Sequence, residues 1–242
     1  MSNENYSYGN QNYWNLRYQN MHYSFDWLED YESLQSYLEN IINNYQERTN
    51  IKILVIGCGT SELSEKIYTK LNIKKISNID FSEKCISYMT EKNKELKEME
   101  YKIMDALSLD YENNSFDLII DKALLDCLFC SEFPFTKSAK YMKEVQRVLK
   151  DNGYYFLVSH SDINNRGVNF SNLDFINFEV NQYVLENKFE IDRINLPEIK
   201  RNYLYICKKI DSSKFTNESY ENTLKKLKEK EERHISNQEN TK

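Results

Sequence analysis

The segment "KILVIGCGTSELS", residues 52–64, constrains the fold more than any other part of the sequence. An apolar run stops at Gly57-Cys58-Gly59, and a helix-like pattern begins a few positions later. The chain holds only 5 Gly among 242 residues, so two glycines separated by one position point to a turn with a specific purpose. A phosphate loop, a dinucleotide turn, a turn for another nucleotide cofactor and a plain tight turn are all open at this point.

Strand-like and helix-like segments alternate along the chain on both sides of this turn. Strands are expected over residues 51–57, 75–80, 100–106, 115–123 and 154–160. Helices are expected over residues 28–46, 61–71, 83–97 and 136–150, the third of them capped by Ser82. This alternation predicts an open α/β sheet with right-handed crossovers. Ligands of such sheets bind at the carboxyl ends of the strands, where the strand order reverses.

The two ends of the chain differ from its middle. Residues 1–12 are polar and low in complexity, which predicts disorder. Residues 177–186 and 203–210 read as two late strands, and they are expected to be antiparallel because no good helix pattern separates them. The charged segment 213–242 predicts a tail helix, interpreted as solvated, with a partner-binding helix as the alternative. Residues 13–212 are therefore expected to form one domain.

Composition disfavours several classes of protein. The net charge of −6 and the sequence pI near 5.3 disfavour a nucleic-acid partner. The apolar runs are far too short to span a bilayer, and the polar start has no signal-peptide pattern, so no membrane partner is expected. An odd number of 5 scattered cysteines suggests reduced thiols and a cytoplasmic protein. Cys127 and Cys130 have C-x-x-C spacing but apolar flanks, so they are interpreted as buried structural cysteines and no metal site is expected.

Two of the possible roles of the glycine turn conflict with the residues that follow it. A phosphate loop needs Gly-Lys-Ser/Thr at its end, whereas Thr60-Ser61-Glu62 stands here. The dinucleotide fingerprint has a third glycine where this chain has Glu62, and Glu65 follows one turn later. Because a pyrophosphate docks against this helix N-terminus, carboxylates beside it would repel the ligand.

A nucleoside cofactor without phosphates and with a positive sulfonium, S-adenosylmethionine (SAM), avoids that conflict. Asp80 ends the second strand, 23 residues after Gly57 (80 − 57), where its carboxylate can accept hydrogen bonds from both ribose hydroxyls. Asp105 ends the third strand and can accept from the adenine amino group. Asp121 ends the fourth strand, beside the expected position of the methyl group. Fitting chemistry at successive strand ends favours SAM over a phosphate loop, a dinucleotide and a plain turn.

The residues quoted so far, with several flanking motifs, resemble a known family. The motifs are "YWNLRY", "FDWLEDY", "ILVIGCGTSELS", "NIDFS", "MDAL", "FDLIIDKALLDCL" and "VLKDNGYYFLVS". They resemble the class I SAM-dependent methyltransferases, and more narrowly the methyltransferase-like group that includes lysine methyltransferases of translation elongation factor 1-alpha. The match covers roughly residues 13–160. It implies a Rossmann-like, seven-stranded, mostly parallel sheet with a reversed final hairpin and helices on both faces.

The resemblance also implies a function for the aromatic segment 13–27, which in this group folds over the cofactor as a lid. Residues implied to contact SAM are Trp14, Arg17, Tyr18, Trp27, Gly57, Gly59, Asp80, Phe81, Asp105, Ala106 and Lys122. Arg17 is expected to pair with the cofactor carboxylate, and a ring facing the sulfonium gains about 0.5–2 kcal/mol. This chain has Ala123-Leu124 where the group has Gly-Thr, which implies a different shape on the acceptor side.

The resemblance implies a protein lysine, most specifically one of elongation factor 1-alpha, as the methyl acceptor. Only the neutral amine is nucleophilic, and a dry pocket favours that form. Asp126, 5 residues past Asp121 on an expected short helix, is the candidate for positioning the amine. His160, just past the fifth strand, is a candidate proton acceptor. A small-molecule or nucleic-acid methyltransferase, a SAM-binding module without activity and an NAD-dependent enzyme remain as alternatives.

The choice between SAM and NAD leads to a direct measurement. SAM at about 100 times its dissociation constant stabilises the folded state by about 2.7 kcal/mol, because it binds the folded chain only. We therefore expect a raised melting temperature with SAM and no shift with NAD, in parallel thermal denaturation. A shift with NAD alone contradicts the interpretation.

Overall fold

The computed structural model describes the chain except residues 1–7, 22, 167–169, 171–172, 191–196 and 240–242. The strands are β1 (Lys52–Ile56), β2 (Lys75–Asp80), β3 (Met99–Ile103), β4 (Phe116–Lys122), β5 (Leu149–Ser159), β6 (Phe178–Glu190) and β7 (Pro197–Lys209). The helices are α1 (Gln11–Gln19), α2 (Tyr31–Ile42), the 3-10 turn η1 (Arg48–Asn50), α3 (Leu63–Lys70), α4 (Glu83–Lys92), α5 (Leu124–Phe129), α6 (Pro134–Val148), α7 (Ile163–Arg166) and α8 (Asn217–Glu239).

All seven strands form one sheet in the order β3-β2-β1-β4-β5-β7-β6. β1 to β5 pair in parallel, and β7 pairs antiparallel with both β5 and β6. The expected Rossmann-like sheet with a reversed final hairpin is therefore confirmed. The strand order reverses between β1 and β4, which opens a crevice at the carboxyl ends of these two strands.

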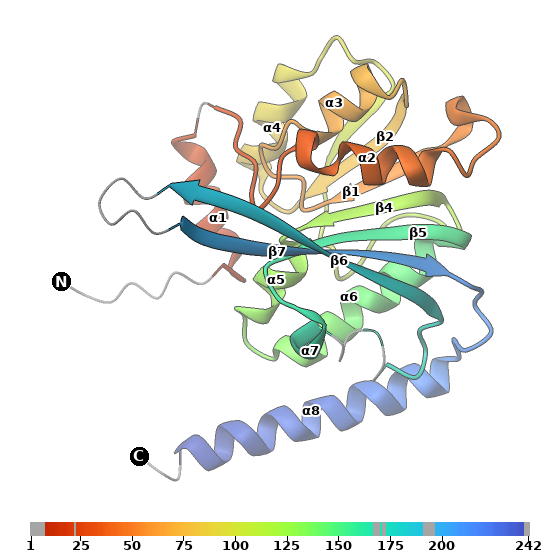
Figure 1. Ribbon diagram of the computed structural model, residues 1–242. Helices are drawn as coiled ribbons and strands as arrows, with labels where there is room; N and C mark the ends of the chain where they lie inside the picture. The colour runs from red at the N-terminus through yellow and green to blue at the C-terminus, as the bar shows by residue number, and fades with distance from the viewer. Residues whose placement is uncertain (1–7, 22, 167–169, 171–172, 191–196, 240–242) are drawn as a thin grey trace.

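Helices cover both faces of the sheet because the central strands are apolar on both sides. Ile53 and Val55 of β1 pack into a core cluster with α2 and α3, whereas Leu54 and Ile56 pack into a second cluster with α5 and α6. Figure 1 shows α2 and α3 on one face and α6 and α8 on the other. A continuous apolar strand between two helical layers is typical of a parallel sheet. No helix among the described residues is long and apolar enough to cross a membrane.

Several expected boundaries differ from the observed ones. α2 is shorter at both ends than the helix expected over 28–46. β3 ends at Ile103, so Asp105 lies two residues beyond the strand instead of within it. The sequence predicts disorder through residue 12, but α1 begins at Gln11, and Asn10 caps it by accepting from the Asn12 amide. Residues 1–7 of that segment lie outside the described residues.

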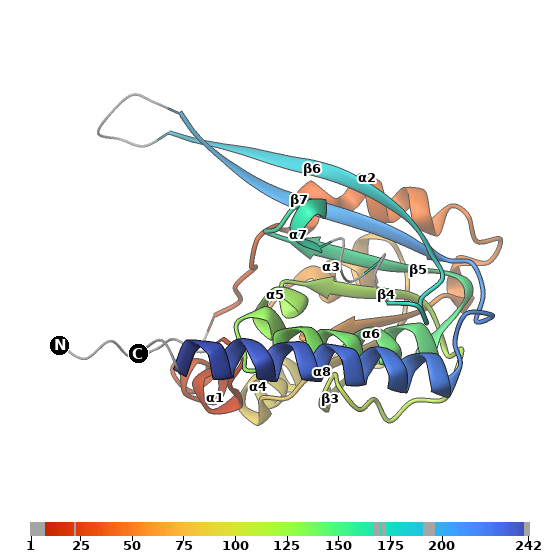
Figure 2. The same cartoon turned by 90° about the horizontal axis from the view of Figure 1, so that it is seen from below.

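The C-terminal helix α8 is not the solvated tail that its charge predicts. It runs alongside α6 in both views of the molecule (Figures 1 and 2). Tyr220 and Leu224 are buried in a core cluster with residues of α6, and Leu227 packs against the same cluster, so these three residues share the face of α8 that contacts the domain. Only a narrow face of α8 contacts the domain, so few of its positions are apolar. The many charged residues at the other positions make this face hard to recognise in the sequence.

A buried carboxylate of α8 caps the N-terminus of α6. Glu231 Oε1 accepts from the Phe135 amide at 2.7 Å, and Glu231 Oε2 accepts from the Thr136 hydroxyl at 2.6 Å. The residue before α6, Phe133, offers no capping side chain. Glu231 therefore satisfies backbone donors that the local sequence leaves without a partner.

This cap predicts the stability of a variant. Glu231→Ala leaves buried donors of α6 without an acceptor, so we expect the free energy of unfolding to fall by about 1–3 kcal/mol. Urea denaturation measures the change. The neighbouring Glu232→Ala is the matched control, because Glu232 is exposed and we expect no measurable loss. Equal stability of the two variants contradicts the capping role.

Candidate functional site

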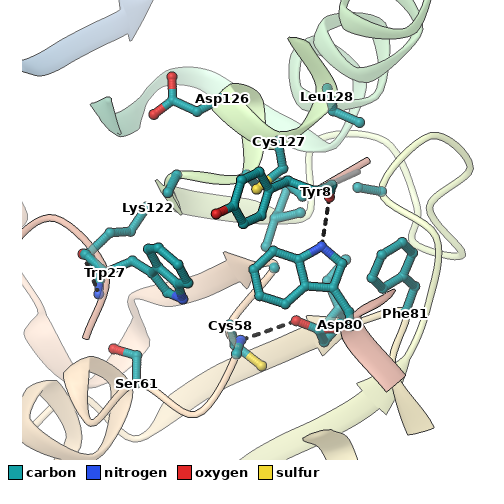
Figure 3. Close-up of a pocket in the computed structure, with 18 of the residues that line it drawn as sticks. Tyr8, Trp27, Cys58, Ser61, Asp80, Phe81, Lys122, Asp126, Cys127 and Leu128 are labelled. Carbon is teal, nitrogen blue, oxygen red and sulfur yellow. Dashed lines mark hydrogen bonds between the residues drawn. The ribbon is translucent and has the colours of Figure 1, made fainter. Parts of the chain in front are cut away.

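A cavity of about 630 Å³ opens at the carboxyl ends of β1, β2 and β4, where the strand order reverses (Figure 3). Of the residues singled out in the sequence, those that line it are Trp14, Tyr18, Trp27, Gly57, Gly59, Asp80, Phe81, Asp105, Ala106, Lys122, Asp126 and His160. Cavities of this size hold nucleotide-sized ligands. Two of the expected site residues, Arg17 and Asp121, do not line the cavity.

The glycine turn forms the floor of the cavity. Gly57 and Gly59 have φ angles of +64° and +51°, which side chains other than glycine rarely adopt. A Cβ at Gly57 would lie 3.1 Å from Leu124, and one at Gly59 would lie 2.9 Å from the hydroxyl of Tyr18. Glycine is therefore required both for the backbone conformation and for the close approach of α5 and of the N-terminal segment.

Asp80 ties this turn to the end of β2. Its Oδ2 accepts from the Gly59 amide at 3.1 Å, and its Oδ1 accepts from the Ser82 amide at 2.9 Å. Burial raises the pKa of Asp80 to about 6, although these backbone donors act in the opposite direction. Each carboxylate oxygen has a second lone pair, so Asp80 can still accept from a ligand hydroxyl.

The N-terminal aromatic residues form a wall of the cavity. Trp14 stacks on Tyr18 with ring centroids 5.6 Å apart, and Trp27 meets Trp14 edge-on at 6.0 Å. Two polar contacts anchor α1 beside Asp80. The side-chain amide nitrogen of Gln11 donates to the Phe81 carbonyl at 2.7 Å, and Ser82 Oγ donates to Asn15 Oδ1 at 2.7 Å. The aromatic segment is therefore part of the cavity, as the lid expectation requires.

Arg17 differs from its expected position. Its guanidinium lies 5.0 Å from the centroid of Trp27 and 6.0 Å from that of Trp14. Its Nε is buried and has no hydrogen-bond partner among the described residues. Because Arg17 does not line the cavity, the expected pairing with a cofactor carboxylate has no support in this arrangement, and the guanidinium instead stabilises the rings of the wall.

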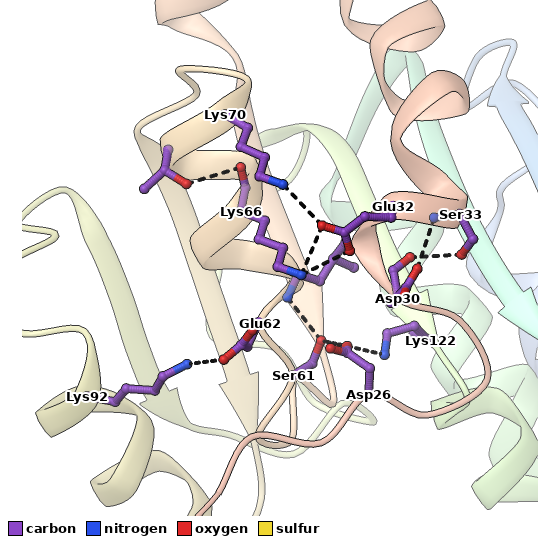
Figure 4. A network of polar contacts seen from close by, with 12 residues as sticks. Asp26, Asp30, Glu32, Ser33, Ser61, Glu62, Lys66, Lys70, Lys92 and Lys122 are labelled. Carbon is purple, nitrogen blue, oxygen red and sulfur yellow. Dashed lines mark hydrogen bonds and ion pairs between the residues drawn. The ribbon is translucent and has the colours of Figure 1, made fainter.

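Lys122 fastens the N-terminal segment to β4 (Figure 4). Its Nζ lies 2.7 Å from Asp26 Oδ1 and donates to the Trp27 carbonyl at 3.0 Å. Asp26 also pairs with the hydroxyl of Ser61, just past the glycine turn. Burial lowers the pKa of Lys122, while Asp26 opposes that shift. Lys122 lines the cavity as expected, but its described polar partners belong to the protein.

The carboxylates that disfavour a dinucleotide in the sequence are themselves neutralised in the fold. Lys92 Nζ lies 3.0 Å from Glu62 and 2.8 Å from Glu65, so both acidic residues after the glycine turn are paired. Figure 4 shows the pair with Glu62. The pKa of Glu62 is lowered by Lys92. Repulsion of a pyrophosphate is therefore weaker than the sequence implies, and the charge at this helix N-terminus alone does not separate SAM from NAD.

Asp121 has a structural role instead of the expected place beside the methyl group. It is fully buried, and it accepts from the Leu124 amide and the Tyr141 hydroxyl at 2.8 Å and from the Tyr155 hydroxyl at 3.0 Å. Burial raises the pKa of Asp121 to about 6. Asp121 does not line the cavity, and its hydrogen bonds to the Leu124 and Leu125 amides fix the start of α5.

Asp126 lies on α5 with its carboxylate at the rim of the cavity. It accepts from Ser159 Oγ at 2.6 Å, pairs with the buried guanidinium of Arg166, and lies 3.0 Å from Nδ1 of His160. Burial tends to raise the pKa of Asp126, but His160, Arg166 and Ser159 lower it. The His160 side chain is 58% exposed and lines the cavity. The Asp126 carboxylate is therefore paired with protein groups and orients His160, whereas the sequence predicts that it positions the acceptor amine directly.

The cavity has further lining residues, and of these only Ala123 and Leu124 are connected by the sequence with the acceptor side of the site. The further lining residues are Tyr8, Gly9, Gln11, Phe25, Leu28, Val55, Ile56, Cys58, Ser61, Leu63, Ile79, Met104, Leu107, Ala123, Leu124, Cys127, Leu128, Cys130 and Lys137. Most are apolar and carry no chemical signal in sequence. The sequence predicts that Cys127 and Cys130 are buried, but Cys130 is exposed and Cys127 is half-buried, because α5 turns its C-terminal end toward the cavity.

A comparison with protein families decides the identity of this fold. The family model described as a methyltransferase domain matches residues 47–237. The chain belongs to this methyltransferase family. The matched region contains the glycine turn and every strand of the sheet.

Individual methyltransferases resemble parts of the chain. The eEF1A lysine and N-terminal methyltransferases of Danio rerio and Homo sapiens are 34% and 33% identical to it over 56% and 63% of its length. The matches cover only 19% and 22% of those proteins, so this chain corresponds to about a fifth of each. EEF1A lysine methyltransferase 4 of Mus musculus is 26% identical over 61% of this chain and 57% of that protein.

Solved methyltransferase structures share the fold. A SAM-dependent methyltransferase of Methanosarcina mazei has a TM-score of 0.53 at 20% identity, over 71% of this chain and 97% of its own. The N-methyltransferase NodS of Bradyrhizobium japonicum, in complex with S-adenosyl-L-homocysteine, has a TM-score of 0.54 at 15% identity, over 74% of this chain and 86% of its own. The expected class I methyltransferase fold is confirmed.

The cavity of this methyltransferase fits SAM. The glycine floor lets a ligand approach the backbone, Asp80 keeps lone pairs for hydroxyl donors, and the aromatic wall provides apolar faces. Together with the family match, these features support the expectation of SAM as cofactor.

Asp80 offers a test of the cofactor site. Asp80→Asn keeps the shape and one of the two acceptors for the backbone amides but removes the charge, so ribose hydroxyls lose a charge-assisted partner worth about 1.5–3 kcal/mol. We expect SAM affinity, measured by calorimetry, to fall about ten-fold or more. Asp110→Asn is the control, because Asp110 is exposed and does not line the cavity. Unchanged affinity of Asp80→Asn would mean that Asp80 serves only the turn.

Proposed function

We propose that this methyltransferase transfers the methyl group of SAM to the side-chain amine of a protein lysine, with elongation factor 1-alpha as the first substrate to test. The observation that carries the proposal is the pairing of His160 with buried Asp126 at the rim of an otherwise largely apolar cavity. The names of the relatives, which are lysine methyltransferases of that factor, support the choice of substrate. A cytoplasmic location follows from the same choice.

The cofactor half of the site is proposed from the lining residues. SAM supplies a methyl group on a sulfonium, which makes that carbon an electrophile. Asp80 would hold the ribose, Asp105 and Ala106 would face the adenine, and the backbone of Gly57 and Gly59 would lie against the amino-acid part. Trp14, Tyr18 and Trp27 would exclude water and offer ring faces to the cation. Orienting and desolvating the reactants in this way can contribute on the order of 7–11 kcal/mol.

The acceptor half of the site is proposed around His160. An incoming lysine is an ammonium ion and must lose a proton before it can react. With Nδ1 of His160 directed to Asp126, the neutral ring has Nε2 as its acceptor, and the Asp126 carboxylate stabilises the imidazolium that forms. The apolar surroundings disfavour the charged amine and assist the same step. His160 is thus the proposed proton acceptor, and Asp126 is a positioning residue.

A variant of His160 tests the proposed proton acceptor better than a variant of Asp126, because His160 is exposed and Asp126 is buried. Asp126→Asn removes the partner of Arg166, whose side chain is 4% exposed, so a loss of activity could reflect an unpaired buried charge. His160 is 58% exposed and can be replaced at small cost to the fold. His160→Gln keeps hydrogen-bonding capacity but cannot take up a proton.

We expect His160→Gln to lower methylation of purified elongation factor 1-alpha at least ten-fold, about 1.4 kcal/mol in barrier, with unchanged SAM affinity. Methyl incorporation from labelled SAM measures the rate, and calorimetry measures binding. His234→Gln on α8 is the control, because His234 is exposed and does not line the cavity. Equal rates for the two variants exclude His160 as the base. No incorporation by the unmodified protein excludes this substrate.

A further inference from the structure

A compact group of three ligand-bearing side chains lies beneath the cofactor cavity. The sulfur atoms of Cys58 and Cys85 and a carboxylate oxygen of Asp80 all lie within 4.8 Å of one another. All three residues are buried. Two sulfurs and one oxygen at this spacing match the donor set of a tetrahedral site for a soft or borderline divalent cation.

Three separate elements bring these residues together. Cys58 lies between the two glycines of the turn, Asp80 ends β2, and Cys85 lies in the first turn of α4, where its amide donates to Ser82 Oγ at 3.4 Å. The cysteines are 27 positions apart (85 − 58) and have no ligand-like spacing in the sequence. The end of β2 and the Ser82 cap of α4 therefore bring Asp80 and Cys85 close to Cys58 in the folded chain.

We propose that Cys58, Asp80 and Cys85 form a binding site for a thiophilic divalent cation such as Zn²⁺ or Cd²⁺. On binding, each thiol releases its proton to solvent as its sulfur–metal bond forms, and Asp80 contributes one carboxylate lone pair. The Gly59 and Ser82 amides occupy one lone pair on each oxygen of Asp80, so another remains for the cation. A fourth ligand can enter from the cavity, because Cys58 and Asp80 both line it (Figure 3).

The position of the site makes the cation and SAM competitors, a consequence that rests on the proposed function. Asp80 is the residue proposed to hold the ribose, and a carboxylate bound to a cation loses the lone pairs that the hydroxyls need. Cys85 does not line the cavity, so it can be changed without touching the cofactor. The cation would therefore inhibit methyl transfer by displacing SAM.

The binding test uses the full chain, kept reduced with a phosphine and free of metal. Titration with Cd²⁺ is followed through the thiolate-to-metal charge-transfer absorption, in the absence of SAM. We expect one equivalent to bind, and Cys85→Ser to lower the affinity at least ten-fold, because a hydroxyl replaces one of the two thiolates that such cations prefer. Cys207→Ser, at another buried cysteine, and Cys130→Ser, in the C-x-x-C segment, are the matched controls and keep the affinity.

Two outcomes overturn the proposal. One is the absence of a charge-transfer band. The other is a band that survives Cys85→Ser but disappears in Cys130→Ser, which assigns the cation to the C-x-x-C segment. If Cys85→Ser does not fold, X-ray absorption of Cys130→Ser with one equivalent of Zn²⁺ replaces it, because that variant leaves only one sulfur ligand in the C-x-x-C segment. Two sulfur neighbours at about 2.3 Å are then expected, and a shell of only oxygen and nitrogen contradicts the site.

A second titration separates this proposal from the proposed function. Saturating SAM is expected to weaken Cd²⁺ binding at least ten-fold in the unmodified chain. One equivalent of Cd²⁺ bound at Cys58 and Cys85 without any effect of SAM leaves the cation site standing and contradicts the assignment of Asp80 to the ribose. Normal SAM binding by a chain that binds no Cd²⁺ contradicts the cation site and leaves the assignment of Asp80 to the ribose standing.

Discussion

The buried carboxylate of Asp121 is the interaction on which the geometry of the cavity depends. It receives the amide of Leu124 and the hydroxyls of Tyr141 and Tyr155, so it joins the end of β4 to α5 and α6. α5 in turn places Leu124 against Gly57 and carries Asp126 to the rim. A charge buried at this depth costs a great deal unless it is fully hydrogen-bonded, which explains why several donors converge on it.

Two lysines, one through an ion pair and one through a hydrogen bond, hold the aromatic segment over the other side of the cavity. Lys122 at the end of β4 binds Asp26, and Lys92 of α4 binds Glu62 and Glu65 and reaches Ser24. The position of the wall formed by Trp14 and the neighbouring rings therefore depends on lysine side chains of β4 and α4. Packing also contributes to its position, because Trp14, Tyr18 and the following Met21 form a buried cluster with Cys85 and Met89 of α4.

The two halves of the cavity have different electrostatics. On the cofactor side, backbone amides or lysines pair with the acidic side chains. The buried carboxylate of Asp80 lines the cavity there. On the acceptor side, His160 is exposed and Asp126 is held by Arg166. One side thus suits a ligand rich in hydroxyls and apolar faces, and the other suits transfer of a proton. The cluster of Cys58, Asp80 and Cys85 lies under the first side, where occupation by a cation would compete with the ligand.

The sequence by itself determined the sheet, the glycine turn and the position of Asp80, because strand periodicity and positive φ angles are local properties of a few adjacent residues. It also placed His160 and Asp126 near the site. Tertiary structure alone decided that Asp121 faces inward, that Arg17 packs on rings and that Lys122 pairs with Asp26, 96 positions away. The direction and partner of a side chain depend on contacts between distant elements. For the same reason only the folded chain shows that α8 packs on α6, and that two cysteines without ligand-like spacing meet beside Asp80.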